Sequence, residues 1–120
     1  MKKKTRVRTR EKPARKTAEN RGLLARFAVH NPDVAWRIVD GEAAVVTPAD
    51  GTLHLLNEVG TAIWLLAEKP VSLSSVVDRI TAEFEVKRTT AGADVAAFVE
   101  DLAAKQLLIV AAAKKLLRAG

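Results

Sequence analysis

Residues 36–64, WRIVDGEAAVVTPADGTLHLLNEVGTAIW, carry the strongest structural signals in the chain. Short apolar runs alternate with turn-forming residues, a pattern typical of antiparallel strands. Asp40-Gly41 is a dipeptide favoured in the two-residue type I′ turn of a hairpin. We therefore expect Trp36 to Val39 to form a strand that pairs with a second strand, Glu42 to Thr47.

A second turn and a third strand follow directly. Pro48-Ala49-Asp50-Gly51 combines a fixed φ, an Asx-type side chain and a glycine that tolerates positive φ. Thr52 to Leu56 then returns as a strand. In this strand His54 is expected to share a face with Thr52, half-exposed and opposite Leu53 and Leu55.

The remaining apolar residues recur with the period of helices. Asn57 stands where its side chain can cap a helix that is expected to run to about Glu68, where Lys69-Pro70 ends it. Ser72 or Ser74 can cap a second helix, whose apolar residues follow an i, i+3, i+4, i+7, i+11 series: Leu73, Val76, Val77, Ile80 and Phe84.

A third helix is expected to start at Thr89 or Thr90 and to end near Lys105. Its apolar face contains Val95, Phe98, Val99 and Leu102. Residues 107–110 are apolar, and the sequence leaves open whether they form a short closing strand or continue the helix. The predicted fold class is α+β, winged-helix-like, with a three-stranded antiparallel sheet followed by three helices.

Charge is unevenly distributed along the 120 residues, whose formal net charge is +6. Residues 1–26 hold eleven Lys or Arg and two Glu, a net of +9, so the other nine bases and twelve acids leave −3. We expect three parts: a disordered basic arm over residues 1–28, a folded domain over 29–110, and a C-terminal tail over 111–120. The arm fits either a solubilising tail or a contact with nucleic acid or an acidic partner.

Composition also limits the classes of protein that fit. The chain has no cysteine, which excludes disulfides and thiolate metal sites. No window approaches the roughly 18 apolar residues expected of a membrane-spanning helix. These features favour a cytoplasmic protein.

Catalytic chemistry has no candidate residues in the sequence. His30 lies in the expected linker before the domain and His54 lies within a strand, without the spacing of a metal site. Carboxylates stand singly on expected helix surfaces or in turns, and no nucleophile or phosphate-binding motif is present. We expect a protein that is not an enzyme and needs no cofactor or metal.

Nucleic-acid binding is the alternative that the winged-helix pattern raises. The third helix, however, carries Asp94, Glu100 and Asp101 against Lys105 alone. Phosphates would repel such a helix in a DNA groove, because affinity for DNA comes largely from Lys and Arg. Contacts from the basic arm would be independent of base sequence.

The motifs in this region resemble those of the PqqD family, the coenzyme PQQ synthesis protein D group that is the type for RiPP recognition elements. The resemblance spans residues 36–109, and its most specific parts are Asp40-Gly41-Glu42, Leu56-Asn57-Glu58-x-Gly60 and Ile63-Trp64. One departure is Gln106, where the family commonly has a glycine after the third helix.

The resemblance implies a non-catalytic peptide chaperone that binds the leader of a ribosomally made precursor peptide and delivers it to a modifying enzyme, usually a radical SAM protein. The leader is expected to add as a strand in the cleft between the third strand and the third helix. This mechanism agrees with the residues, because an edge strand offers unpaired N–H and C=O groups to an extended peptide. The expected peptide-binding residues are Thr52, Leu53, His54, Leu55 and Leu56 on the strand and Val95, Ala96, Val99 and Ala103 on the helix.

Two further possibilities stay open at this point. A regulatory subunit could use the same groove for a protein tail, and the chain could be a monomer or a homodimer. The apolar surplus of residues 51–66 is explained either by packing of Trp64 and Leu65 inside the domain or by docking on a partner enzyme.

Overall fold

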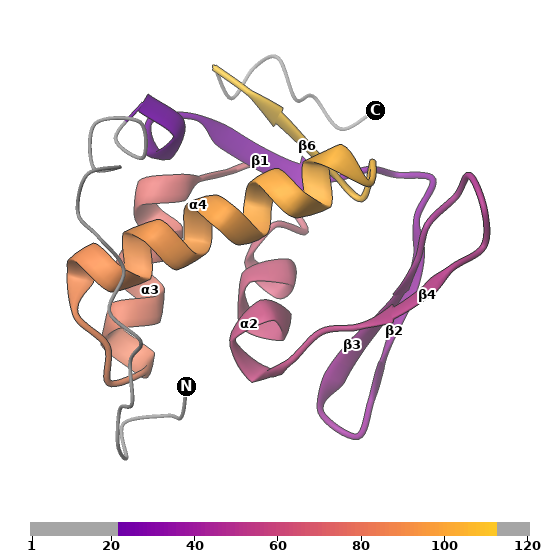
Figure 1. Cartoon of the computed structure of the whole chain (residues 1–120), viewed down its shortest axis with the longest axis horizontal. Helices are drawn as coiled ribbons and strands as arrows, with labels where there is room; N and C mark the ends of the chain where they lie inside the picture. The colour runs from indigo at the N-terminus through magenta and orange to yellow at the C-terminus, as the bar shows by residue number, and fades with distance from the viewer. Residues whose placement is uncertain (1–21, 113–120) are drawn as a thin grey trace.

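Two three-stranded antiparallel sheets flank a set of helices in the computed structural model, which describes residues 22–112 (Figure 1). The strands are β1 (Phe27–His30), β2 (Ala35–Val39), β3 (Glu42–Val46), β4 (Leu53–Leu55), β5 (Val71–Ser72) and β6 (Leu108–Ala111), and the helices are α2 (Glu58–Leu66), α3 (Leu73–Glu83) and α4 (Arg88–Ala104). One sheet has the order β2-β3-β4 and the other β5-β1-β6. The predicted α+β class, with a three-stranded sheet followed by helices, is confirmed.

The first hairpin forms as predicted. Asp40 and Gly41 both have positive φ, 51° and 82°, as a type I′ turn requires. The turn sets the register of β2 on β3, with Trp36 opposite Val45.

The second turn is also as predicted, with Gly51 at a φ of 72°. The Thr47 hydroxyl donates a hydrogen bond to the Asp50 carboxylate, and this bond is the main cause that lowers the pKa of Asp50 to about 2. The charged carboxylate also accepts from the Thr52 N–H at 3.0 Å. These bonds close the turn that returns the chain into β4.

Side-chain caps set the start of two helices. The Asn57 Oδ1 accepts from the Gly60 N–H at 2.7 Å at the start of α2, and the Ser72 hydroxyl accepts from the Ser75 N–H at 3.1 Å at the start of α3. Both caps were predicted, with Ser72 rather than Ser74 as the second. α2 ends at Leu66, two residues earlier than predicted.

The predicted start of the third helix at Thr89 or Thr90 is wrong. α4 begins at Arg88 after Lys87, which makes no side-chain capping bond. Thr90 is buried within the first turns, and the Arg88 guanidinium pairs with the Asp78 carboxylate of α3 at 2.7 Å.

The second sheet was not foreseen in the sequence. β1 is its central strand and pairs with β6, for example Ala28 with Val110, and with β5, for example Phe27 with Ser72. The closing strand, the first of the two alternatives for residues 107–110, therefore forms, as β6 over residues 108–111. The boundary expected between residues 28 and 29 falls inside β1, so Phe27 and Ala28 belong to the sheet. The rest of the basic arm (1–21) and of the tail (113–120) lies outside the described residues.

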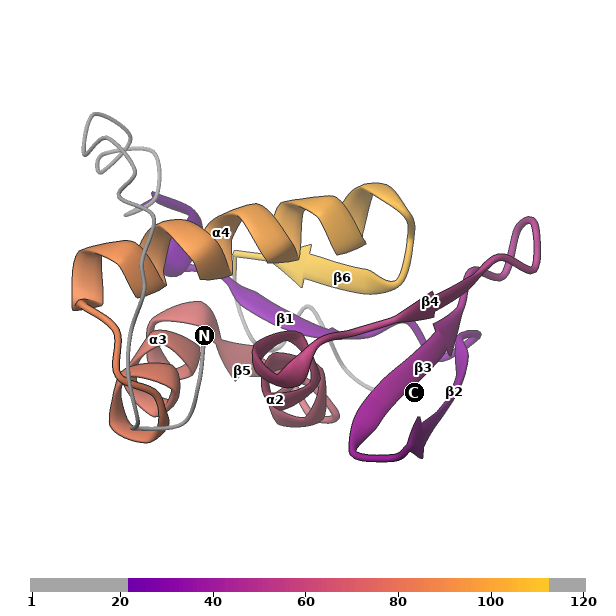
Figure 2. The same cartoon turned by 60° about the horizontal axis from the view of Figure 1, so that its bottom comes forward.

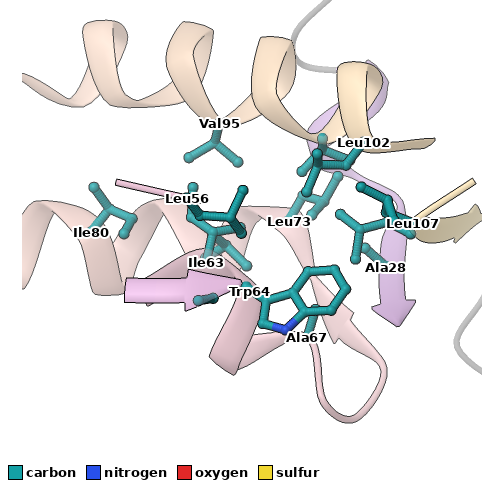
Figure 3. Packing of buried hydrophobic residues seen from close by; sticks show 14 of the residues in the cluster. Ala28, Leu56, Ile63, Trp64, Ala67, Leu73, Ile80, Val95, Leu102 and Leu107 are labelled. Atoms are coloured by element: carbon teal, nitrogen blue, oxygen red, sulfur yellow. The ribbon is translucent and has the colours of Figure 1, made fainter. Parts of the chain in front are cut away.

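The hydrophobic core lies between the three helices and the two sheets (Figure 3). Trp64 is completely buried, which supports the packing explanation for this residue, whereas Leu65 is 41% exposed. The largest fully buried side chains are Trp64, Phe84, Leu73, Ile80, Leu107, Val45, Val76, Val77, Val95 and Val99.

His30 connects β1 to α2 instead of lying in a linker. Its imidazole stacks on the Trp64 indole with ring centres 3.7 Å apart, and Trp36 meets both rings edge-on. The Nε2 lies 2.6 Å from the Trp64 carbonyl oxygen; since a carbonyl only accepts, Nε2 is the donor. Burial lowers the pKa of His30, outweighing the opposing effects of this hydrogen bond and of Glu68.

The end of α4 forms a Schellman motif around Gln106. The Leu107 N–H donates to the Leu102 carbonyl at 2.8 Å, and the Gln106 N–H donates to the Ala103 carbonyl at 2.9 Å. Gln106 has a φ of 64°, the left-handed conformation that glycine adopts most easily. Asn31 Nδ2 donates to the Gln106 carbonyl at 2.8 Å and holds this turn against the segment after β1. This left-handed backbone conformation explains why the family that the sequence resembles commonly has a glycine at this position.

We expect the substitution Gln106→Gly to stabilise the domain. It removes a left-handed penalty of roughly 1–2 kcal/mol and adds a backbone entropy cost of about 0.5–1 kcal/mol, for a net gain of roughly 0–1.5 kcal/mol. Urea unfolding measures the change. Gln106→Ala is the control, since it keeps the penalty and should give no gain; an equal gain from both variants would contradict this explanation.

We expect His30 to make folding stability depend on pH. Its folded-state pKa lies below the ordinary 6.5, so the stability contributed by neutral His30 is complete above about 6.5 and is lost as the pH falls toward the folded-state value. The measurement is the difference in unfolding free energy between the wild type and His30→Phe at pH 7.5 and pH 5.0. Relative to His30→Phe, the wild type should have a lower unfolding free energy at pH 5.0 than at pH 7.5. An equal difference at the two pH values would show that His30 does not titrate in this range.

Candidate functional site

β4 is an edge strand with one unpaired side. Within residues 22–112 it pairs only with β3, and it leads directly into α2 (Figure 2). The Thr47 N–H donates to the Thr52 carbonyl and the Leu56 N–H to the Ala43 carbonyl, both at 2.9 Å. These two bonds fix which backbone groups of the strand face β3.

Antiparallel pairing alternates, so a strand directs the N–H and C=O of every second residue to the same neighbour. Thr52 and Leu56 bond to β3, and His54 pairs with Val45 in the same register. The N–H and C=O of Leu53 and Leu55 therefore point to the unpaired side. These four groups are the hydrogen-bonding capacity of the open edge.

The side chains of β4 divide between two faces as the alternation predicts. Leu53 and Leu55 are 60% and 61% exposed, the highest values among the large apolar residues described. His54 is half-buried on the inner face, and its Nε2 is buried without a hydrogen-bond partner among the described residues.

The outer face of the β2-β3-β4 sheet is apolar beside this edge. The register places Ala44 beside Leu55 and Val46 beside Leu53, and Val39 on β2 is 42% exposed. We call Val39, Ala44, Val46, Leu53 and Leu55 the outer sheet face. Arg37 lies on this face beside Ala44, and Glu42 lies beside Val39; both are exposed, so the apolar surface is confined to the part next to the β4 edge. The solvent face of an antiparallel sheet is usually polar, so this apolar part indicates a contact surface.

A hollow of about 280 Å³ lies between the first turns of α2 and the middle of α4. It is lined by Asn57, Val59, Gly60, Ile63, Asp94 and Phe98. A Cβ on Gly60 would lie only 2.9 Å from Cε1 of Phe98. Glycine at this position therefore lets the Phe98 ring lie against α2, where it forms one wall of the hollow.

The structure does not bring all the predicted site residues to the surface. Leu53, His54 and Leu55 form β4, with Thr52 exposed before it and Leu56 buried after it. On α4, Val95, Ala96 and Val99 are at most 3% exposed and Ala103 is half-buried. Val95 points from α4 toward Leu56 and Ile63 in the core (Figure 3).

Asp94 and Phe98 are the α4 residues that line the hollow, and the sequence analysis missed both as site residues. Each precedes a predicted residue, Val95 or Val99, by one position, which is about 100° around a helix. The helical spacing alone predicts that Phe98 belongs to the core, because Phe98 fits the apolar stripe of the helix. The signal that could have found this face is a carboxylate four residues before an aromatic, which places both on one side of α4.

Residues 22–112 contain no cluster of three or more His, Asp or Glu side chains that could hold a metal ion. In the same range no helix is both long enough and apolar enough to cross a membrane.

Comparison with known proteins confirms the family resemblance. The family model for coenzyme PQQ synthesis protein D (PqqD) matches residues 42–108. No curated protein sequence matches the chain. A solved structure described as TbiB1 in complex with the TbiA(beta) leader peptide has a TM-score of 0.62 and 34% identity, covering 67% of this chain and 93% of that one. A second, described as lasso peptide synthetase B1 complexed with the leader peptide, has a TM-score of 0.57 and 23% identity, covering 68% and 96%, and shows likeness of fold.

Proline substitutions test the backbone orientation of β4. His54→Pro removes an N–H that faces β3 and leaves a carbonyl of β3 without its partner, which should cost about 1–3 kcal/mol. Leu55→Pro removes an N–H at the open edge, so its cost should stay below about 1 kcal/mol. Thermal and urea unfolding of both variants measures the difference. A larger loss for Leu55→Pro than for His54→Pro would mean that the strand faces the other way.

Proposed function

Because the chain belongs to the PqqD family, we propose that it is a non-catalytic adaptor that captures the leader of a precursor peptide by strand addition and presents it to a modifying enzyme. The observation that carries the proposal is the unpaired edge of β4, with the N–H and C=O groups of Leu53 and Leu55 directed outward. The TbiB1 structure supports it, because that protein is 34% identical over most of its own length and is described in complex with a leader peptide.

Capture proceeds through the backbone first. A leader strand antiparallel to β4 exchanges hydrogen bonds with Leu53 and Leu55 and becomes the fourth strand of the β2-β3-β4 sheet. Since these bonds do not depend on the leader's side chains, they fix its direction and register but not its sequence.

Side chains of the leader then provide selectivity. Residues of the added strand alternate between the two faces of the sheet. Those on one face extend the outer sheet face, while those on the other approach the hollow beside Phe98. A leader with apolar residues at every second position therefore buries exposed surface of Leu53 and Leu55.

The modifying enzyme is proposed as the second partner. The outer sheet face is a suitable contact for it, since an exposed apolar patch usually marks a protein interaction site. The radical SAM class follows from the family resemblance, and no residue of the site selects that reaction class.

Nucleic-acid binding has little support from the described residues. Arg88 at the start of α4 pairs with Asp78 at 2.7 Å, and Lys105 after its end pairs with Asp101 at 2.8 Å, so the remaining acids of the helix, Asp94 and Glu100, dominate its charge. A helix of this charge would be repelled by a phosphate backbone.

Binding of a leader peptide tests the proposal. We expect a synthetic peptide with the leader sequence of a precursor encoded near this gene to bind with micromolar affinity, as measured by calorimetry. Its NMR shifts should concentrate on Leu53, Leu55 and Phe98. Leu55→Pro should weaken binding at least tenfold, since the leader loses a backbone donor.

The matched control is Leu65→Ala, which removes an exposed leucine on α2 away from the edge and should leave the affinity unchanged. Equal affinity for the wild type and Leu55→Pro, or shifts that concentrate on another surface, would overturn capture by strand addition.

A further inference from the structure

β2 is a second open edge of the β2-β3-β4 sheet. β2 and β4 lie on opposite sides of β3 (Figure 2), and within residues 22–112 β2 pairs only with β3. Four of its five residues are exposed, among them Ile38 at 43% and Val39 at 42%. An exposed edge of this kind can accept another strand.

The hairpin fixes which backbone groups of β2 face outward. Val39 and Glu42 flank the two-residue turn, so they form the closing hydrogen-bonded pair of the hairpin. By alternation Arg37 also bonds to β3, whereas the N–H and C=O of Trp36 and Ile38 point to the open side. Within residues 22–112 no backbone group of another segment bonds to these four groups.

The usual protections of an edge strand are missing from β2. Edge strands are commonly very short, contain lysine or proline, or carry a bulge. β2 has five residues against three in β4, it pairs with β3 without interruption from Ala35 to Val39, and its one charged residue is Arg37. The strand is therefore suited to pairing with a partner.

A second copy of the chain is the partner that fits this edge. Two β2 strands related by a two-fold axis pair antiparallel, and the residue at the axis sets the register. An axis at Arg37 would place the two Arg37 side chains opposite each other, which is destabilising. An axis at Trp36 would pair Ile38 with Val34, whose N–H already donates to the Asn31 carbonyl at 3.1 Å. An axis at Ile38 avoids both problems.

The side chains agree with an axis at Ile38. The two Ile38 side chains then lie opposite each other and cover exposed apolar surface. On the other face the stem of Arg37 lies over Val39 of the second copy. Its guanidinium can reach the Glu42 carboxylate of that copy, because the Cα atoms of Arg37 and this Glu42 are about 10 Å apart. Neither Arg37 nor Glu42 makes an ion pair within residues 22–112, so each meets an opposite charge in the second copy.

We propose that the β2 edges of two copies pair antiparallel about Ile38 and form a homodimer with a continuous six-stranded sheet. The two β4 edges lie at the outer ends of this sheet, so the dimer occupies neither of them. Because the two-fold axis is perpendicular to the sheet, the outer sheet faces of both copies lie on the same side. The dimer therefore presents two open β4 edges and one extended outer face.

The oligomeric state of the full chain tests the proposal. We expect sedimentation equilibrium to give a mass that rises with concentration toward twice the 13.0 kDa of the chain. Ile38→Pro removes an outward-facing N–H and should weaken dimerisation at least tenfold. Leu55→Pro, the same change at the other edge, should leave it unchanged. A wild type that stays monomeric at millimolar concentration, or equal dimerisation of Ile38→Pro and the wild type, would overturn the proposal.

Cysteine crosslinking tests the register, since the chain has no cysteine of its own. In the proposed dimer the Cα atoms of the two Ile38 residues are about 5.5 Å apart, within the range of a disulfide. Ile38→Cys should therefore crosslink under mild oxidation. Arg37→Cys is the control, because its two positions are diagonal at about 7–8 Å and should crosslink at least fivefold less. No crosslink from Ile38→Cys, or a stronger one from Arg37→Cys, would overturn the register, whether or not Ile38→Pro folds.

The dimer and the proposed function can fail separately. Ile38→Pro should retain the affinity for the leader, because β4 is intact, whereas Leu55→Pro should lose leader capture and still dimerise. Dimerisation without leader capture by the wild type would contradict the proposed function, and leader capture by a strictly monomeric wild type would contradict the dimer.

Discussion

The pairing register of β3 with β4 is the constraint on which the candidate site depends. It is fixed from both ends, by the Thr47–Asp50–Thr52 turn and by the Leu56 bond to Ala43. Alternation then leaves no freedom: the backbone groups of His54 face β3, and those of Leu53 and Leu55 face outward. A shift of one residue would turn the leucine side chains to the inner face and would direct the backbone groups of His54, instead of those of Leu53 and Leu55, to the open edge.

The second sheet holds the helical side of the site in place. β1 brings His30 onto Trp64, while the turn after α4 is bonded to Asn31. α2 and α4 are therefore fixed at the ends remote from the hollow. At the hollow itself the two helices meet through Gly60 and Phe98, where the missing Cβ permits close approach. The site thus consists of two parts: the open edge of β4 in the β2-β3-β4 sheet, and a hollow between two helices that the β5-β1-β6 sheet holds in place.

Sequence reasoning recovered the elements whose signals are local. Asp40-Gly41 specifies a turn through its backbone preferences, and Asn57 specifies a helix cap through its side chain. Both form as predicted. β1 was missed because it has four residues, follows a basic arm and pairs with a strand about 80 residues later in the chain. On α4 the apolar period identified the core face, but it did not show which adjacent face borders the hollow, since this depends on how α2 packs. The start of α4 was predicted from a threonine cap, but the helix begins at Arg88 without a side-chain capping bond.

Amide hydrogen exchange in β4 reports on whether a leader peptide adds to this edge of the sheet. In the free protein the Leu53 and Leu55 amides should exchange quickly and the His54 amide slowly, because only the last is bonded within the sheet. Addition of a saturating leader peptide should slow Leu53 and Leu55 by at least tenfold and leave His54 nearly unchanged. Slow exchange of Leu53 and Leu55 before peptide is added, or unchanged fast exchange at saturation, would contradict strand addition at this edge.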